Sequence, residues 1–160
     1  MYPRGNDATG GLGTNNVDHT KFSRGNAFFG ELIMTFLLCF VVFETAVNKK
    51  GDKYHVPLAI GMAVFLGHIV LVPITGCSIN PTRTVGPAIV ALGMGRLPAN
   101  STAWSDMWVF WFGPLCGAAL AGLMAVFWWH PILKEGKTEG FDAVDDVLGQ
   151  GVDLSKPKGE

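Results

Sequence analysis

Charged side chains are scarce in this chain, and neither sign is in excess. Of its 160 residues, 16% are charged and 49% are hydrophobic, and the formal net charge is −1. A chain without a basic surplus has no electrostatic basis for binding nucleic acid, so we expect no nucleic-acid partner. The hydrophobic residues gather into runs that are too long for an ordinary globular domain. This pattern indicates a membrane protein.

Cysteine is also scarce, and its spacing excludes two kinds of protein. Cys39, Cys77 and Cys116 lie in or beside apolar runs. They show neither the spacing of a metal site nor that of a disulfide framework, so we expect no metal and no cofactor. The sequence also lacks a nucleophile–base pair and a phosphate-binding loop, and therefore does not predict an enzyme. Residues 1–25 contain no apolar core of a signal peptide, so we expect no cleavable one.

Three apolar runs are each long enough to cross the roughly 30 Å hydrocarbon core of a bilayer. They cover about residues 27–47, 57–74 and 107–129. Aromatic residues at both ends of the third run suit the membrane–water interfaces, and its glycines and alanines permit close helix contact. Three lysines in the loop at 48–56 favour a cytoplasmic position for that loop.

A shorter run after the second span begins with the residue order of a helix start. Asn80 is a preferred N-cap residue, and Pro81 at the first helical position loses no needed hydrogen bond. A helix from there to about residue 91 would be about 18 Å long, which is roughly half of the bilayer core. Residues 76–79 would then be non-helical at membrane depth, where such backbone lines water or is buried in protein. We therefore expect a polar pathway here, in preference to a surface loop after a buried strand.

Several polar residues in or near these runs have two interpretations each. Glu31 either faces the bundle interior or reaches headgroup water, and His68 either lines a water path or packs with a hydrogen bond. Arg83 either lies in a polar cavity or serves as a salt-bridge partner. Asn100 begins an Asn-Ser-Thr sequon, and it lies outside if the lysine loop is cytoplasmic, where a glycan could be added.

In their order along the chain, these motifs resemble the C-terminal half of the aquaporin family. The similar stretches are Gly30-Glu31 for the family's fourth helix, Pro57 to Gly61 with Gly67-His68 for the fifth, Thr75 to Ala88 for the second pore loop, and Trp108 to Pro114 for the sixth helix. The stretches Val72-Pro73-Ile74-Thr75-Gly76 and His55-Val56-Pro57 most resemble plant-type aquaporins of the plasma membrane.

The resemblance implies an all-α transmembrane fold that forms half of an aquaporin, with three spanning helices and one half-spanning re-entrant helix. It divides the chain into an extramembrane loop segment at 1–25, the family's second repeat at 26–131 and a cytoplasmic tail at 132–160. The expected location is an integral, multi-pass position in the plasma membrane, in contact with lipid.

The resemblance also implies a role for each motif residue. The expected selectivity filter is His68, Cys77 and Arg83, and the expected pore helix start is Asn80, Pro81 and Thr82, where the family has Asn-Pro-Ala. The expected pore carbonyls are those of Gly76, Cys77, Ser78 and Ile79. Glu31 resembles the buried acid that braces the pore loop. His55 resembles a histidine that senses acidification in plant-type relatives and helps to close the pore.

The implied function is passive water transport, by a water channel subunit or a partial chain of one. Because His68 and Thr84 stand where glycerol-conducting members carry a small residue and an acid, we expect water in preference to glycerol or other small neutral solutes. The family's first repeat is absent, so the chain alone is not expected to conduct. Its expected partners are that missing repeat and the other subunits of a homotetramer. The alternative is a short membrane protein that does not conduct, and that associates with full-length aquaporins and regulates them.

Overall fold

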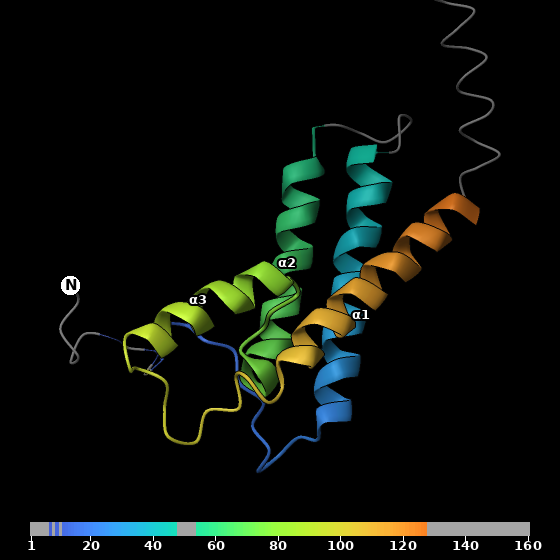
Figure 1. The fold of residues 1–160 in the computed structure, drawn as a ribbon. Helices are drawn as coiled ribbons and strands as arrows, with labels where there is room; N and C mark the ends of the chain where they lie inside the picture. Colours follow the sequence, from blue (N-terminus) through green and yellow to red (C-terminus); the bar gives the residue numbers. More distant parts are fainter. Residues whose placement is uncertain (1–6, 8, 10, 48–53, 128–160) are drawn as a thin grey trace, which may run out of the picture. The chain divides into compact units, whose positions relative to one another are not determined.

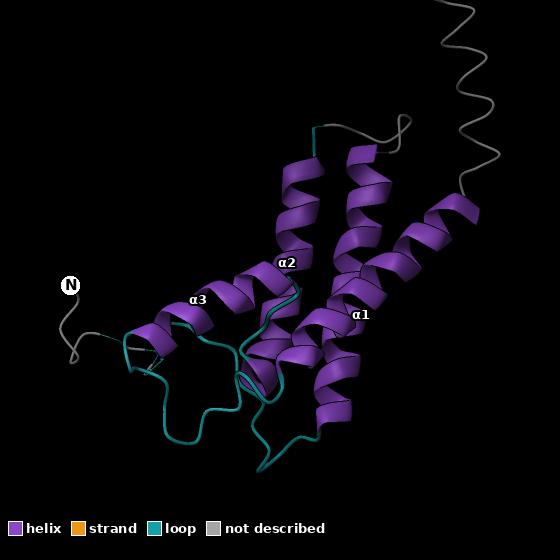
Figure 2. Ribbon diagram, in the orientation of Figure 1, coloured by secondary structure: helices purple, strands orange, loops and turns teal. Residues whose placement is uncertain are grey.

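The computed structural model describes residues 7, 9, 11–47 and 54–127, which form helices joined by irregular segments, with no strand among these residues (Figure 2). The helices are α1 (Arg24–Val42), which continues into a π-helical turn (Phe43–Val47), α2 (Val56–Thr75), α3 (Pro81–Gly93) and a last helix, Met107–Phe127 (Figure 1). The chain divides into two units, Met1–Ala125 and Val126–Glu160, and the account below concerns the first. The predicted tail at 132–160 and the lysines of the loop at 48–53 lie outside the described residues.

Three of these helices are long and apolar enough to cross a membrane. They are Arg24–Val47 with 24 residues, Val56–Thr75 with 20 and Met107–Phe127 with 21. Helix α3 has 13 residues and is therefore about 20 Å long, well short of a bilayer core. The predicted all-α fold, with three spanning helices and one shorter helix, is confirmed.

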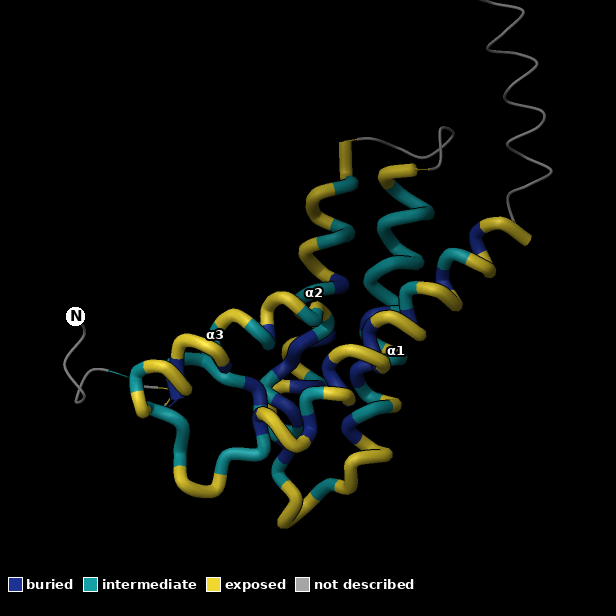
Figure 3. Tube along the Cα trace, viewed as in Figure 1, coloured by how far each residue is buried: buried dark blue, intermediate teal, exposed yellow. Residues whose placement is uncertain are grey.

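Large apolar side chains cover the outer surfaces of the long helices. On α2, for example, Phe65 is 57% exposed and Ile69 is 58% exposed. Figure 3 shows mostly exposed and half-buried residues along α1 and α2, and buried residues that recur along the last helix. Such a surface suits lipid or further protein, since contiguous apolar patches of this extent are rare on soluble monomers.

Helix α1 and the last helix contact each other at two glycines. A Cβ atom added to Gly117 would overlap the carbonyl oxygen of Leu32 and lie 2.9 Å from the backbone nitrogen of Phe36. One added to Gly113 would lie 3.0 Å from Cβ of Glu31. Because only glycine permits this approach, the small-residue surface predicted for the third span lies directly against α1 beside Glu31.

Candidate functional site

Helix α3 begins with its predicted cap. Asn80 has extended backbone angles, φ −159° and ψ 115°, and its Oδ1 accepts hydrogen bonds from the backbone nitrogen of Thr82 at 3.0 Å and from Thr82 Oγ1 at 2.8 Å. The hydroxyl of Thr82, which stands where the family has alanine, therefore adds a second donor to the same oxygen. Within the described part of the chain, the amide nitrogen of Asn80 donates no hydrogen bond.

Glu31 connects α1 to the segment that precedes α3. Its side chain is 0% exposed. Oε1 accepts hydrogen bonds from Thr75 Oγ1 at 2.7 Å and from the backbone nitrogen of Ser78 at 2.9 Å, and Oε2 accepts one from the backbone nitrogen of Ile79 at 2.6 Å. A carboxylate that accepts several backbone donors stabilises a loop that cannot pair its own N–H groups.

The backbone between α2 and α3 is held in an uncommon conformation. Gly76, Cys77 and Ile79 have positive φ values of 76°, 54° and 46°. For residues with a side chain this left-handed region is costly, and it persists only where surrounding contacts determine it. Those contacts are the hydrogen bonds to Glu31 and one from the backbone nitrogen of Cys77 to Thr75 Oγ1 at 3.1 Å.

The four residues whose carbonyls are the predicted pore acceptors divide into two pairs by their burial. Gly76 and Ile79 are partly exposed, whereas Cys77 and Ser78 are 0% and 2% exposed. Among the described residues, none of these four carbonyl oxygens accepts a hydrogen bond. The carbonyls of the two partly exposed residues, Gly76 and Ile79, therefore have unused acceptor capacity within the described residues.

Arg83 is held by the segment that precedes α1. Its Nη1 donates hydrogen bonds to the carbonyl oxygen of Gly13 and to Asn15 Oδ1, both at 2.7 Å. Asn15 is 0% exposed, and its Nδ2 donates to the carbonyl oxygen of Thr75 at 3.0 Å, while its Oδ1 also accepts from Thr84 Oγ1 at 2.9 Å. One buried amide therefore joins the N-terminal segment, the end of α2 and the first turn of α3.

Sequence reasoning did not single out Asn15. A guanidinium near the membrane midplane needs acceptors, and that requirement predicts a partner for Arg83 in general terms. The segment at 11–23 contains two asparagines and two glycine carbonyls, and no spacing rule selects one of these acceptors over the others.

The other predicted site residues differ in their surroundings. His68 is exposed on α2, with Nδ1 2.8 Å from the carbonyl oxygen of Val64, and shares no hydrogen bond with Arg83 within the described part of the chain. Cys77 is buried. His55 is exposed at the start of α2, and Asn100 is exposed in a turn closed by a hydrogen bond from Ser101 N to Pro98 O at 2.9 Å.

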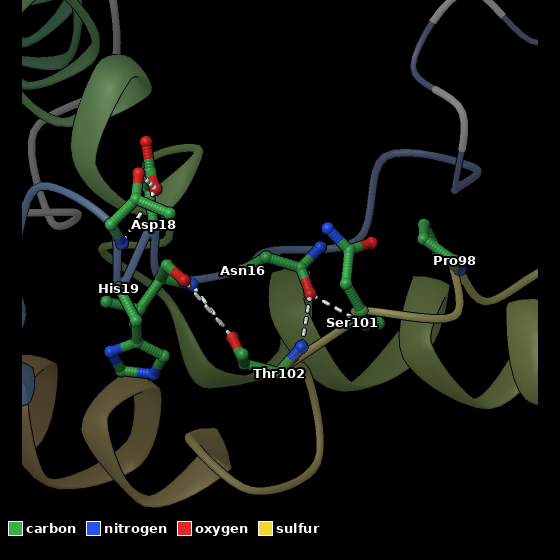
Figure 4. Close-up of a pocket in the computed structure, with 9 residues that line it drawn as sticks. Asn16, Asp18, His19, Pro98, Ser101 and Thr102 are labelled. Atoms are coloured by element: carbon green, nitrogen blue, oxygen red, sulfur yellow. Dashed lines mark hydrogen bonds between the residues drawn. The ribbon is translucent and has the colours of Figure 1, made fainter.

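A pocket of about 450 Å³ lies between two loops, residues 11–23 and 94–106. We call these two loops together the loop face. Asn16 Oδ1 accepts hydrogen bonds from Ser101 Oγ at 2.7 Å and from the backbone nitrogen of Thr102 at 3.0 Å (Figure 4). The backbone nitrogen of Val17 donates to Thr102 Oγ1 at 3.1 Å. These bonds place the segment before α1 and the loop before the last helix side by side.

Comparison with models of protein families shows to which family the chain belongs. A family model described as Major intrinsic protein matches residues 4–125. The chain belongs to the major intrinsic protein family. As a member of this family with three long apolar helices, it is a multi-pass integral membrane protein.

Several similar proteins are plant aquaporins, which confirms the resemblance found in the motifs. Aquaporin PIP1-1 of Arabidopsis thaliana is 42% identical over 131 residues, which cover 79% of this chain and 43% of that protein. Two proteins of Oryza sativa subsp. japonica are also similar. Aquaporin PIP2-5 is 39% identical over 125 residues, covering 75% of this chain and 40% of its own length, and probable aquaporin PIP2-8 is 38% identical over 146 residues, covering 88% and 49%. The chain thus spans less than half the length of these relatives.

Proposed function

We propose that this chain forms one half of the pore of a water channel in the plasma membrane, and that a first repeat on another chain or segment supplies the other half. The observation that carries the proposal is the exposed polar face at the start of α3. Asn80 and Arg83 are both exposed and are three residues apart, so they lie on one side of the helix. The buried residues Glu31 and Asn15 fix the backbone and the guanidinium behind that face.

The chemistry of this face suits a permeant that is polar and uncharged. The amide nitrogen of Asn80 can donate to water, and the unused carbonyls of Gly76 and Ile79 can accept from it. The positive end of the α3 dipole and the Arg83 guanidinium both repel cations, including protons. Because every unsatisfied polar group at membrane depth costs free energy, such a face requires either water or a polar partner.

The preference for water over glycerol rests on His68 and Thr84. We propose that the imidazole of His68 narrows the pathway where glycerol-conducting relatives have a small residue. Thr84 Oγ1 is 2.9 Å from Asn15 Oδ1 and 2.6 Å from Ser78 Oγ. An acid at position 84 would place a carboxylate against the oxygen of Asn15, so the threonine hydroxyl is compatible with the amide that holds Arg83.

The test is osmotic water permeability of lipid vesicles that contain this chain, a first-repeat chain from a relative, or both. We expect background permeability from either chain alone and a clear increase from the pair. Replacing His68 by glycine and Arg83 by valine in the pair should admit glycerol or cations, whereas Cys116→Ser, at an exposed position of the last helix, should not. A pair that conducts no more than its parts would contradict the proposal.

The alternative function is regulation of full-length aquaporins without conduction. The chain covers 40–49% of the length of its relatives and carries one pore loop. Vesicles that contain a full-length relative, with and without this chain, distinguish the two functions. A change in permeability caused by this chain, together with no conduction by the reconstituted pair, would support the regulator. The homotetramer remains a prediction that cross-linking of the assembled pair would test.

A further inference from the structure

A buried carboxylate on the loop face joins the starts of two spanning helices. Asp106, which directly precedes the last helix, is 0% exposed. Its Oδ1 accepts a hydrogen bond from Arg24 Nε at 2.7 Å, and Arg24 is the first residue of α1. Its Oδ2 lies 2.6 Å from Nε2 of His19, whose side chain is 34% exposed.

His19 ends a short segment that reaches the pore helix. We call residues 13–19 the strap. Gly13 and Asn15 accept hydrogen bonds from Arg83 at one end of the strap, and His19 contacts Asp106 at the other. Between them, the backbone nitrogen of Asp18 donates to the carbonyl oxygen of Ile74 at 3.3 Å. The strap is therefore bound to Arg83 at one end. At the other end its own His19, a residue type that can change its charge, contacts Asp106.

Charged groups from several elements lie around His19. Asp106 faces the imidazole from the loop before the last helix, and Arg24 from α1 shares that carboxylate. Within its own segment, Asp18 accepts from Thr20 Oγ1 and lies 3.5 Å from Lys21 Nζ, so these two charges largely offset each other. The part of the 94–106 loop that lines the adjoining pocket consists of Pro98 and the uncharged polar residues 100–102.

We propose that His19 and Asp106 form a pH-sensitive latch that holds the strap, and through it Arg83, more firmly at acidic than at neutral pH. The effect on water flow rests on the function proposed above, whereas the latch itself does not.

The direction of the effect follows from the two titrations. Burial raises the pKa of Asp106, but hydrogen bonds from Arg24, Thr102 and His19 outweigh burial, so its pKa lies below the ordinary value and its carboxylate stays charged above that range. Histidine side chains change charge between about pH 5 and 8. Below that window the contact joins two opposite charges, whereas above it only the carboxylate acceptor is charged. Above it, the neutral ring can still donate from Nε2, so the latch weakens without breaking.

The test is hydrogen exchange of the strap amides in the full chain, embedded in lipid nanodiscs, at pH 5.5 and 7.5. After correction for intrinsic exchange, we expect the protection of the Val17 and Asp18 amides to fall about fivefold from pH 5.5 to 7.5. In His19→Gln, which can donate a hydrogen bond but cannot gain a charge, protection should not change over this range. His130→Gln removes another histidine and leaves the strap sequence intact, so it should retain the fivefold change.

Two results would overturn the latch. One is protection that is independent of pH in the unmodified chain, and the other is the same pH dependence in His19→Gln. Asp106→Asn gives a second check, because it removes the charge and should reduce protection at pH 5.5 to the level seen at 7.5. Exchange reports on the latch whether or not the chain conducts. A fivefold change without water flow in the reconstituted pair would therefore refute the channel alone, and flow without that change would refute the latch alone.

Discussion

At the scale of single residues, two buried side chains hold the polar face. Glu31 binds two backbone N–H groups and a hydroxyl, and Asn15 binds a guanidinium, a hydroxyl and a carbonyl. The resemblance to the family implied that Glu31 is a brace, whereas its place in an apolar span left open whether it faces the bundle interior or headgroup water. Its observed burial is the environment that this interpretation requires, whereas a residue reaching headgroup water would be exposed.

Replacing Glu31 by alanine should leave the backbone N–H groups of Ser78 and Ile79 without acceptors. Each buried, unpaired group costs about 1–3 kcal/mol, so we expect a loss of several kcal/mol in the free energy of unfolding. Urea unfolding in detergent, followed by circular dichroism, measures this loss. Glu44→Gln, in the π-helical turn that follows α1, is the matched control and should change little. Equal stability of both variants would indicate that the contacts of Glu31 contribute nothing.

Replacing Asn15 by alanine removes one acceptor of Arg83 and leaves the hydroxyl of Thr84 and the carbonyl of Thr75 with fewer partners. We expect destabilisation of about 1–3 kcal/mol. In the reconstituted pair, we also expect increased entry of cations, because a less ordered guanidinium repels them less effectively. Asn26→Ala, at an exposed position of α1, is the control for both measurements. If the Asn15 variant retains the cation exclusion of the unmodified pair, the carbonyl of Gly13 is sufficient to hold Arg83.

At the scale of helices, local signals predicted most of the structure. Asn80 and Pro81 gave the start of α3 correctly, since capping depends on neighbouring residues. The first span begins at Arg24, three residues before the expected position, because Ser23 accepts a hydrogen bond from the backbone nitrogen of Asn26 and serves as the N-cap. The contacts of Asn15 and Asp106 could not be predicted, because they join residues 60–87 positions apart and no local pattern encodes such pairs.

The contact between α1 and the last helix can be tested with two glycines of one helix. In Gly117→Ala the new methyl group would overlap the backbone of Leu32, so we expect destabilisation of about 1–3 kcal/mol. In Gly122→Ala the nearest atom is Cζ of Phe43 at 4.0 Å, and a gain of up to about 1 kcal/mol is expected from helix propensity. Thermal unfolding in detergent compares the two. Equal changes in stability in both variants would show that close contact between α1 and the last helix at Gly117 does not contribute to the free energy of unfolding.

At the scale of the whole chain, the hydrogen bonds of the loop face constrain the topology. Asn16 bonds to Ser101 and Thr102, so the segment before α1 and the loop before the last helix lie on the same side of the membrane. Two spanning helices, α1 and α2, separate these segments along the chain, and an even number of crossings returns the chain to the side from which it started. The contacts of Asn16 and the topology with three spanning helices therefore place these two segments on the same side of the membrane.

The same topology yields a prediction for Asn100. If the lysine loop is cytoplasmic, the loop face is outside, and expression in cells that add N-linked glycans should modify the exposed Asn100. The measurement is a shift in electrophoretic mobility that a glycosidase removes and that Asn100→Gln abolishes. Absence of the shift would be explained by the opposite orientation if a sequon engineered into the 48–53 loop is modified instead. If neither site is modified, the prediction that Asn100 carries a glycan is wrong.

The ion pair between Arg24 and Asp106 also determines the order in which parts of the chain can assemble during synthesis. The two residues are 82 positions apart. At about 5–20 residues per second, a ribosome needs roughly 4–16 s to proceed from the arginine to the aspartate. During that interval α1 and α2 are synthesised while the guanidinium at the start of α1 still lacks its carboxylate. The ion pair and the contacts between the two loops of the loop face can therefore form only when the last helix begins to leave the ribosome.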